Sequence, residues 1–192
     1  MKNVLNVFKA LLLIVVSAQF AWADVSDNAS FTKALVGKKT SEKESAIDWL
    51  LASQPEGVAK PLLTSWLNGT LYYVSDRKNE HYQQLYVIQG IKTATQAQSA
   101  WNYETLAIES SKQFKKVRVN NKLRGILRVE IASMGLNSDD AKVRYQSVNN
   151  LLSSKDIAII ERIEQMLPNE PDGDVGFDGI AVGSSYIFRY SR

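Results

Sequence analysis

Apolar residues recur at helical spacing in two stretches of the sequence, residues 41–67 and residues 138–167. The first stretch is broken at Pro55 and the second at Ser153-Ser154, so each divides into two segments with an apolar face of its own. Positions three and four apart share one face of an α-helix, and the spacing therefore predicts a pair of helices in each stretch. The second helix is predicted from about Glu56. It contains Pro61, which is unfavourable in a helix interior, so a kink there or a start nearer Lys60 is the alternative.

Residues that favour helix ends indicate where these helices begin and stop. Thr40 or Ser41 is expected to cap the first helix, and Ser138 is expected to cap the first helix of the second stretch. Hydroxyl side chains in that position accept hydrogen bonds from the free N–H groups of the first turn. Asn68-Gly69 is expected to end the helix that precedes it, because glycine readily adopts the left-handed conformation that closes many helices.

Between the two helical stretches the period of the pattern changes. Residues 71–74 and 85–88 are rich in aromatic and β-branched side chains, and they flank a polar segment, 75–84. This pattern predicts two short strands joined by a polar loop, which form a small β-hairpin inserted around residues 70–90. Residues 90–109 follow neither period, and Trp101 is their one clear apolar anchor.

A further helix is predicted after the basic segment that follows the hairpin. Asn120 or Asn121 is expected to cap it, since an Asn side chain can accept N–H groups of the first turn, and Gly135 is expected to close it. A shorter helix is expected around residues 31–35. The apolar face of the longer helix consists of Leu123, Ile126, Leu127, Ile131 and Met134.

The two helical stretches share one order of features. In both, a hydroxyl-led acidic cap opens the first helix, a Leu-Leu pair closes it, and an apolar second helix follows a short break. This order is typical of HEAT-like repeats, although two units alone can also arise by coincidence. We predict a mainly α fold of HEAT-like helical hairpins with a small inserted β-hairpin. The predicted helical domain covers residues 24–167, and an irregular tail covers residues 168–192.

The first 23 residues have the features of a secretory signal peptide. Lys2 and Lys9 give a positive amino-terminal region, residues 10–16 are an unbroken apolar run, and Ala21-Trp22-Ala23 offers small residues for cleavage. The apolar run is shorter than the roughly 20 residues that span a bilayer. We therefore expect an exported, periplasmic protein. The alternative is an uncleaved signal, or a partner, that holds the protein at the inner membrane.

Composition narrows the chemistry open to such a protein. The sequence has no cysteine and one histidine, His81, so disulfides, thiol nucleophiles and thiolate metal sites are excluded. We predict no catalytic residues, no metal site and no cofactor. Asp172, Asp174 and Asp178 lie in a Gly-rich tail that superficially resembles a calcium loop, but a closing Glu at the required position is missing.

Seven Lys and Arg residues occur between Lys112 and Arg128 without an acidic residue among them. Two of the 23 bases lie in the predicted signal, which leaves 21 bases against 20 acids, so this basic run is a local feature. On a helical wheel Lys122, Arg124 and Arg128 fall beside and behind the apolar face, which predicts a solvated helix surface. Binding of phosphate or of lipid headgroups is the alternative. We expect no nucleic acid partner, because an exported protein meets little of it.

The residues around this run form the candidate interaction or structural motif. Arg118 alternates with two valines, which predicts an extended segment before the helix. Glu130 falls on the apolar face of that helix, so we expect it to be paired, with Arg144 as the partner. The candidate motif consists of Arg118, Asn120, Asn121, Lys122, Arg124 and Arg128.

The order of these segments resembles a known family. A signal peptide, a helical stretch ending "LLTSWLNGTLYY", a strand insert, "VRVNNKLRGILR" and "DDAKVRYQSVNNLLSS" resemble the amino-terminal extracytoplasmic region of the urea ABC transporter permease of the branched-chain amino acid permease type. The resemblance extends to about residue 167, and residues 67–73 and 117–128 are its most specific parts. In that family membrane-spanning helices follow this region, whereas here the sequence after Pro168 departs from the family.

The resemblance implies a non-enzymatic accessory module of a urea or amide ABC transport system. Its expected partners are the transporter's membrane subunits or its solute-binding protein, and it would associate with the membrane through them or through an uncleaved signal. A periplasmic interaction scaffold, or a helical protein that binds anionic surfaces through the basic run and is unrelated to transport, is the alternative.

Overall fold

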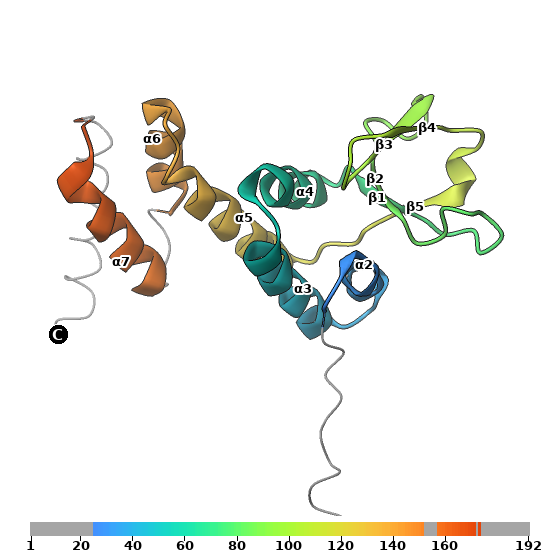
Figure 1. Ribbon diagram of the computed structural model, residues 1–192, viewed down its shortest axis with the longest axis horizontal. Helices are drawn as coiled ribbons and strands as arrows, with labels where there is room; N and C mark the ends of the chain where they lie inside the picture. The colour runs from blue at the N-terminus through green and yellow to red at the C-terminus, as the bar shows by residue number, and fades with distance from the viewer. Residues whose placement is uncertain (1–24, 152–156, 172, 174–192) are drawn as a thin grey trace, which may run out of the picture.

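The structure is a computed structural model that describes residues 25–151, 157–171 and 173. The fold is mixed and mainly helical: helices lie at both ends of the described chain, and a small antiparallel sheet is inserted between them (Figure 1). The predicted signal peptide and most of the predicted tail lie outside the described residues, as do Asp172, Asp174 and Asp178 of the calcium-like segment.

The amino-terminal layer consists of three helices, α2 (Asn28–Val36), α3 (Thr40–Ser53) and α4 (Glu56–Asn68). The short helix predicted near residues 31–35 is confirmed as α2, which Asp27 and Ser30 open with a capping box. The cap predicted for α3 is wrong, because Lys39 occupies the cap position without a side-chain hydrogen bond. The Thr40 hydroxyl instead accepts a hydrogen bond from Asn120.

Helix α4 begins at Glu56, as predicted, and runs through Pro61, so the alternative start near Lys60 is wrong. Proline has no N–H to donate to the carbonyl four residues earlier, which here belongs to Gly57. The hydroxyl of Tyr103, from the loop at residues 100–104, donates to that Gly57 oxygen at 3.0 Å. The helix therefore continues through Pro61 with a substitute hydrogen bond, and it ends as predicted at Gly69, which is left-handed with φ 71°.

The described residues contain a five-stranded antiparallel sheet where the sequence predicted a two-stranded hairpin. The two predicted strands are present and pair with each other, Leu71 opposite Val87. The missed strands are short, and two of them are mostly polar, so no alternating apolar pattern marks them. The sheet has the order β4-β3-β2-β1-β5, with strands β1 (Leu71–Val74), β2 (Leu85–Val87), β3 (Gln96–Ser99), β4 (Thr105–Ala107) and β5 (Phe114–Lys116).

The second helical group begins with α5 (Asn121–Gly135), continues with α6 (Ala141–Leu151) and reaches α7 (Ile157–Met166). Gly135 was predicted to cap α5, but it is the last residue of the helix, and Leu136 is the cap. A side chain at position 135 would collide with the Ser147 hydroxyl of α6. The predicted Ser138 cap is also wrong. Asp140 directly precedes α6, and its carboxylate accepts the Lys142 N–H at 2.9 Å.

Successive side chains of β1 point to opposite faces of the sheet, and each face packs in a different apolar cluster. Leu71 and Tyr73 face the main core, which α2 to α5 build around the fully buried Trp66. Tyr72 and Val74 face a second cluster beneath the loops of the sheet. A third cluster lies between α5, α6 and α7 and includes Ala132, Leu136, Val148, Leu151, Ile160 and Ile163.

Helices that are neighbours in the chain also pack on one another. Helix α2 packs on α3, α4 contacts α3, and α5 packs on α6. Helix α4 packs on α5 although the whole sheet separates them in sequence, so the sheet is an insertion into a helical succession (Figure 1). None of the helices in the described residues combines the length and the apolar character needed to cross a membrane.

Candidate functional site

Residues 117–120 form an extended link between β5 and α5, as predicted for Arg118-Val119. The backbone of this link is held from both sides. Val117 N–H donates to Leu71 O of β1 at 2.9 Å. Arg118 O accepts from Lys43 Nζ at 3.2 Å and from Trp66 Nε1 at 3.4 Å. The link therefore joins the sheet to α3 and α4.

Asn120 is the cap of α5, which confirms the predicted use of an Asn at this helix start. Its Oδ1 accepts Leu123 N–H at 2.8 Å, and its Nδ2 donates to Thr40 Oγ1 at 3.0 Å. Asn120 does the capping and also ties α5 to α3, while Asn121 is the exposed first residue of the helix.

The basic run spans several elements rather than one helix face. Lys112 lies in a short 3₁₀ helix, η1 (Ser111–Gln113), and two lysines lie on β5 with exposed side chains. Arg118 is exposed on the link, and Lys122, Arg124 and Arg128 lie on α5. The structure thus distributes these cations over the sheet, the link and α5.

The prediction of a solvated surface is wrong for Arg124. Its side chain is half-buried, and Nη1 donates to Leu67 O in the last turn of α4 at 3.4 Å. Carbonyl groups in a last turn have no partner within their own helix, so a guanidinium there stabilises the helix end. Lys122 is largely exposed and forms an ion pair with Glu44 of α3, whereas Arg128 is exposed to solvent, as predicted.

A groove of about 1080 Å³ opens beside the link, and we call it the basic groove. Its walls are the α2–α3 turn, the start of α3, strand β5 and the link itself. None of the described residues that line it is Asp or Glu. Its cationic lining residues are Lys38, Lys43, Lys115, Lys116 and Arg118.

Lys43 is the buried member of this set, with 6% of its surface exposed. Its ammonium donates to Leu35 O at 2.6 Å and to Arg118 O at 3.2 Å. Burial, and secondarily the positive charge of Arg118, lowers the pKa of Lys43 below its usual 10.5. An ammonium has three N–H donors, so two carbonyl partners leave one donor at the groove wall.

Sequence reasoning missed Lys43, although a signal for it was present. Lys43 precedes Ile47 by four positions and Leu50 by seven, so it lies on the apolar face of α3. A lysine in that position must either extend to solvent or find buried oxygen atoms. Its carbonyl partners come from residues 35 and 118, which the sequence does not place near each other.

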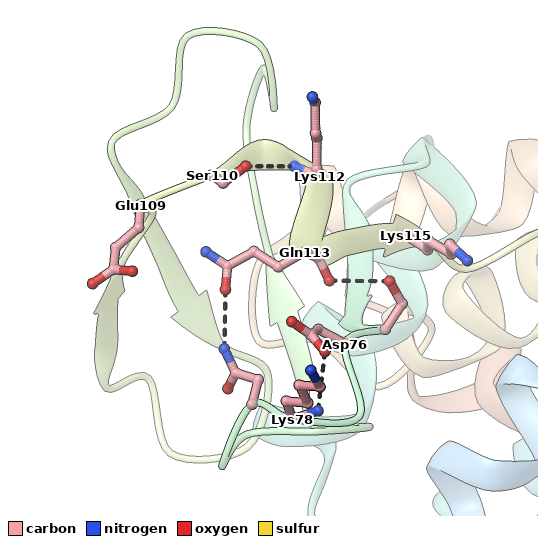
Figure 2. A pocket seen from close by; sticks show the side chains of 9 residues that line it. Asp76, Lys78, Glu109, Ser110, Lys112, Gln113 and Lys115 are labelled. Atoms are coloured by element: carbon pink, nitrogen blue, oxygen red, sulfur yellow. Dashed lines mark hydrogen bonds between the residues drawn. The ribbon is translucent and has the colours of Figure 1, made fainter.

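A second depression lies at the other end of β5, and we call it the polar hollow (Figure 2). It measures about 620 Å³ and contains both signs of charge, with Asp76 and Glu109 beside Lys78, Lys112 and Lys115. Local hydrogen bonds fix its loops, as Figure 2 shows. These are Ser75 Oγ to Gln113 O at 3.2 Å, Lys78 N to Asp76 Oδ1 at 3.0 Å, Asn79 Nδ2 to Gln113 Oε1 at 3.0 Å and Lys112 N to Ser110 Oγ at 3.3 Å.

Arg144 of α6 makes an ion pair that the sequence did not predict. Its Nε donates to Glu170 Oε2 at 2.8 Å and its Nη2 to Glu170 Oε1 at 2.8 Å, a bidentate arrangement in which the Glu170 side chain is buried and the Arg144 side chain is largely buried. This pair holds the segment after α7 against α6. The pairing of Arg144 with Glu130 stays a prediction.

His81 lies in the β1–β2 loop, half-buried against the Tyr86 ring. Its Nδ1 is 3.2 Å from Gln84 Oε1, and its Nε2 is 3.4 Å from Glu80 Oε1. Within the described ranges no three side chains of His, Cys, Asp or Glu gather closely enough to hold a metal ion.

Comparison of the chain with protein-family models, with curated protein sequences and with solved structures finds no match. The basic groove is the candidate functional site on geometry alone, since it combines a buried cation with a lining that lacks acidic side chains.

Proposed function

We propose that this chain is a non-enzymatic, extracytoplasmic accessory module of a urea-type ABC transport system. It acts by contacting the membrane subunits or the solute-binding protein of that system. The proposal starts from the resemblance to the amino-terminal region of the urea permease, carried by residues 67–73 and 117–128.

One observation carries the proposal furthest: these two segments contact each other. Val117 N–H donates to Leu71 O, and Tyr72 is the strand partner of Lys116, directly before the second segment. Arg124 Nη1 donates to Leu67 O. If the two segments resembled the family only by chance, there would be no reason for them to contact each other in the fold. Their contact supports the interpretation that both belong to one structural joint of the resembled domain.

The helical succession supports a HEAT-like arrangement within this proposal. Helices α3, α4, α5 and α6 pack in chain order, and the sheet is inserted between α4 and α5. In repeats of this kind each helix pair contacts its neighbours and the stack presents an extended surface to other proteins. The module is therefore proposed to bind its partners through its helices rather than through the sheet.

Two exposed tyrosines allow a matched test of this surface. Tyr145 on α6 is 40% exposed and Tyr82 in the β1–β2 loop is 37% exposed. A photo-crosslinking amino acid at residue 145 is expected to capture a membrane subunit or the solute-binding protein of the transporter in cell envelopes. The same group at residue 82 is expected to capture neither.

Crosslinks to those subunits from residue 145 alone support the proposal. If neither position captures a transporter subunit, and if no genes for an ABC ATPase and a solute-binding protein lie beside the gene of this chain, the proposal is wrong. Equal capture from both positions contradicts the assignment of the contact to the helices.

A further inference from the structure

We propose that the basic groove binds an amphiphilic anion, a single carboxylate or phosphate group carried on an apolar chain. This inference does not depend on the proposed role in transport, because it rests on the charges and walls of the groove. It assigns a ligand class to residues of α3, β5 and the link.

The charge balance of the groove is the first argument. Among the described residues that line it, five carry positive charge and none carries negative charge. Burying a cation without an opposite charge is costly, and a bound anion would offset that cost at Lys43. The ammonium of Lys43 is held in place by Leu35 O and Arg118 O, which leaves its third N–H available to an anionic oxygen.

The anion head would meet charge at two depths of the groove. Lys43 is buried in the wall, whereas the side chains of Lys116 and Arg118 are exposed at the rim. A single head group can therefore take hydrogen bonds from a fixed buried donor and from cations at the rim.

The apolar part of the lining is the second argument. Half-buried Val36, Tyr73 and Val119 line the same groove as the cations. A small inorganic anion has no apolar surface to place against these side chains. The volume of about 1080 Å³ lies just above the range of small-molecule sites, about 300–1,000 Å³, so it leaves room for more than a small anion. Both features fit a ligand with an apolar body.

The polar hollow does not share this chemistry. Asp76 and Glu109 line it together with the lysines, so its charges are mixed. Its side chains are hydrogen-bonded to the loops around them. Lys78, which lines the hollow and not the basic groove, is therefore a matched control for substitutions of groove cations.

The test uses the full chain and three soluble probes below any micelle-forming concentration: dodecyl phosphate, inorganic phosphate and neutral dodecyl maltoside. Binding is measured by isothermal titration calorimetry. Dodecyl phosphate is expected to bind with one site, at least tenfold more tightly than either of the other two. If inorganic phosphate or dodecyl maltoside binds as tightly as dodecyl phosphate, the proposal is wrong.

Substitutions then locate the site. The double variant Lys116→Ala and Arg118→Ala removes two exposed side chains and keeps the Arg118 carbonyl that Lys43 and Trp66 use. It is expected to weaken dodecyl phosphate binding at least tenfold without changing the melting temperature by more than a few degrees. The control pair Lys78→Ala and Arg128→Ala is expected to stay within twofold of the wild type. Equal weakening in both pairs overturns the assignment to the groove.

Vesicles separate the two sources of such a ligand. Co-sedimentation with phosphatidylglycerol vesicles, together with binding of the monomeric probe, assigns the ligand to membrane lipid. Binding of the monomeric probe without co-sedimentation assigns it to a free amphiphile. Co-sedimentation without binding of the monomeric probe overturns the proposal, because the whole basic surface then attracts the membrane.

Discussion

The basic groove and the polar hollow both open beside β5, and Lys115 lines each of them, but their charges are arranged differently. In the hollow, lysines lie among carboxylates, and the loops bond to one another. In the groove, Lys43 is buried against two carbonyl oxygens, and the described lining residues include no acid. In the hollow, the polar groups hydrogen-bond to neighbouring protein groups, and these bonds stabilise the loops. A buried cation held only by neutral oxygens leaves room for an anion from outside.

The difference also follows from the elements that build each site. The hollow lies between the loops at residues 75–79 and 109–113, and side chains of one loop hydrogen-bond to groups of the other. The groove lies where α3 meets β5 and the link, and Lys43 and Arg118, which contact each other there, are 75 residues apart in sequence. Its buried lysine belongs to one element and its carbonyl partners to two others. The predictions that follow compare the two sites, from the largest expected effect to the smallest.

Lys43→Met is expected to have the largest effect, because Met fills a similar volume but donates no hydrogen bond. The change leaves Leu35 O without its Lys43 donor and leaves Arg118 O with Trp66 as its donor. A lost hydrogen bond to a charged group costs about 1.5–3 kcal/mol, and removing the buried charge offsets part of this. We expect a net loss of about 2 kcal/mol in the free energy of unfolding by denaturant titration. Lys78→Ala in the hollow should change it by less than about 0.5 kcal/mol.

The same variant gives a test by pH. The folded pKa of Lys43 is lowered below 10.5, mainly by burial, so between the folded pKa and 10.5 the unfolded chain binds more protons. Stability contributed by this group therefore rises as pH rises through that interval. The difference in free energy of unfolding between wild type and Lys43→Met is expected to grow in favour of the wild type toward pH 10.5. A difference that shrinks with rising pH would show that the ammonium is not desolvated.

Asn120→Ala removes both the cap of α5 and the bond to Thr40, and we expect a loss of about 1–2 kcal/mol. Asn120→Asp keeps an oxygen for the Leu123 N–H but loses the amide donor to Thr40, so it should recover most of the lost stability. Asn79→Ala is the comparison in the polar hollow and should cost about 1 kcal/mol or less, since solvent can reach that loop. Thermal melts of the three variants check this order.

Tyr103→Phe tests whether the sheet supports α4 at its proline. The hydroxyl donates to Gly57 O, the carbonyl that Pro61 leaves without its helical donor. Tyr103 is 47% exposed, so water can replace the bond in part, and we expect a cost of about 0.5–1 kcal/mol. Hydrogen exchange in the first turns of α4 should increase in this variant. Unchanged exchange there would contradict the role of Tyr103.

Arg124→Ala should have the smallest measurable effect, about 0.5 kcal/mol, from the loss of its long bond to Leu67 O. Arg128→Ala, one turn further along the exposed side of α5, should change stability by less than that. The two arginines would be equivalent if the basic run were only a solvated helix surface. Equal effects in urea titrations would therefore restore that simpler interpretation.

Periodicity and helix-end chemistry predicted much of the helical part. The apolar spacing found α4 and α5, and "VRVNN" gave an extended segment followed by an Asn cap, since these features depend on neighbours in sequence. Strands β3 and β4 could not be found in this way: Ala97 is the one fully buried side chain in β3, and β4 has none. Their place in the sheet depends on β2, which pairs with β3.

The candidate site was predicted only in part, for the same reason. Arg118 and Asn120 were singled out, but the properties that matter are the Arg118 carbonyl and the contact of Asn120 with Thr40, 80 residues away. Arg124 was assigned to solvent because the helical wheel of α5 does not show that α4 ends beside it. Lys43 was overlooked although its position on an apolar face was readable, because its partners lie on other elements.

Hydrogen–deuterium exchange with and without dodecyl phosphate tests most directly whether the two sites differ as described. Binding in the basic groove is expected to slow exchange of backbone amides in residues 36–43 and 117–120. Amides in residues 75–79 and 109–113, around the polar hollow, are expected to exchange at unchanged rates. Protection in both regions alike, or in the hollow alone, would contradict the claim that the unbalanced charge of the groove forms an anion site.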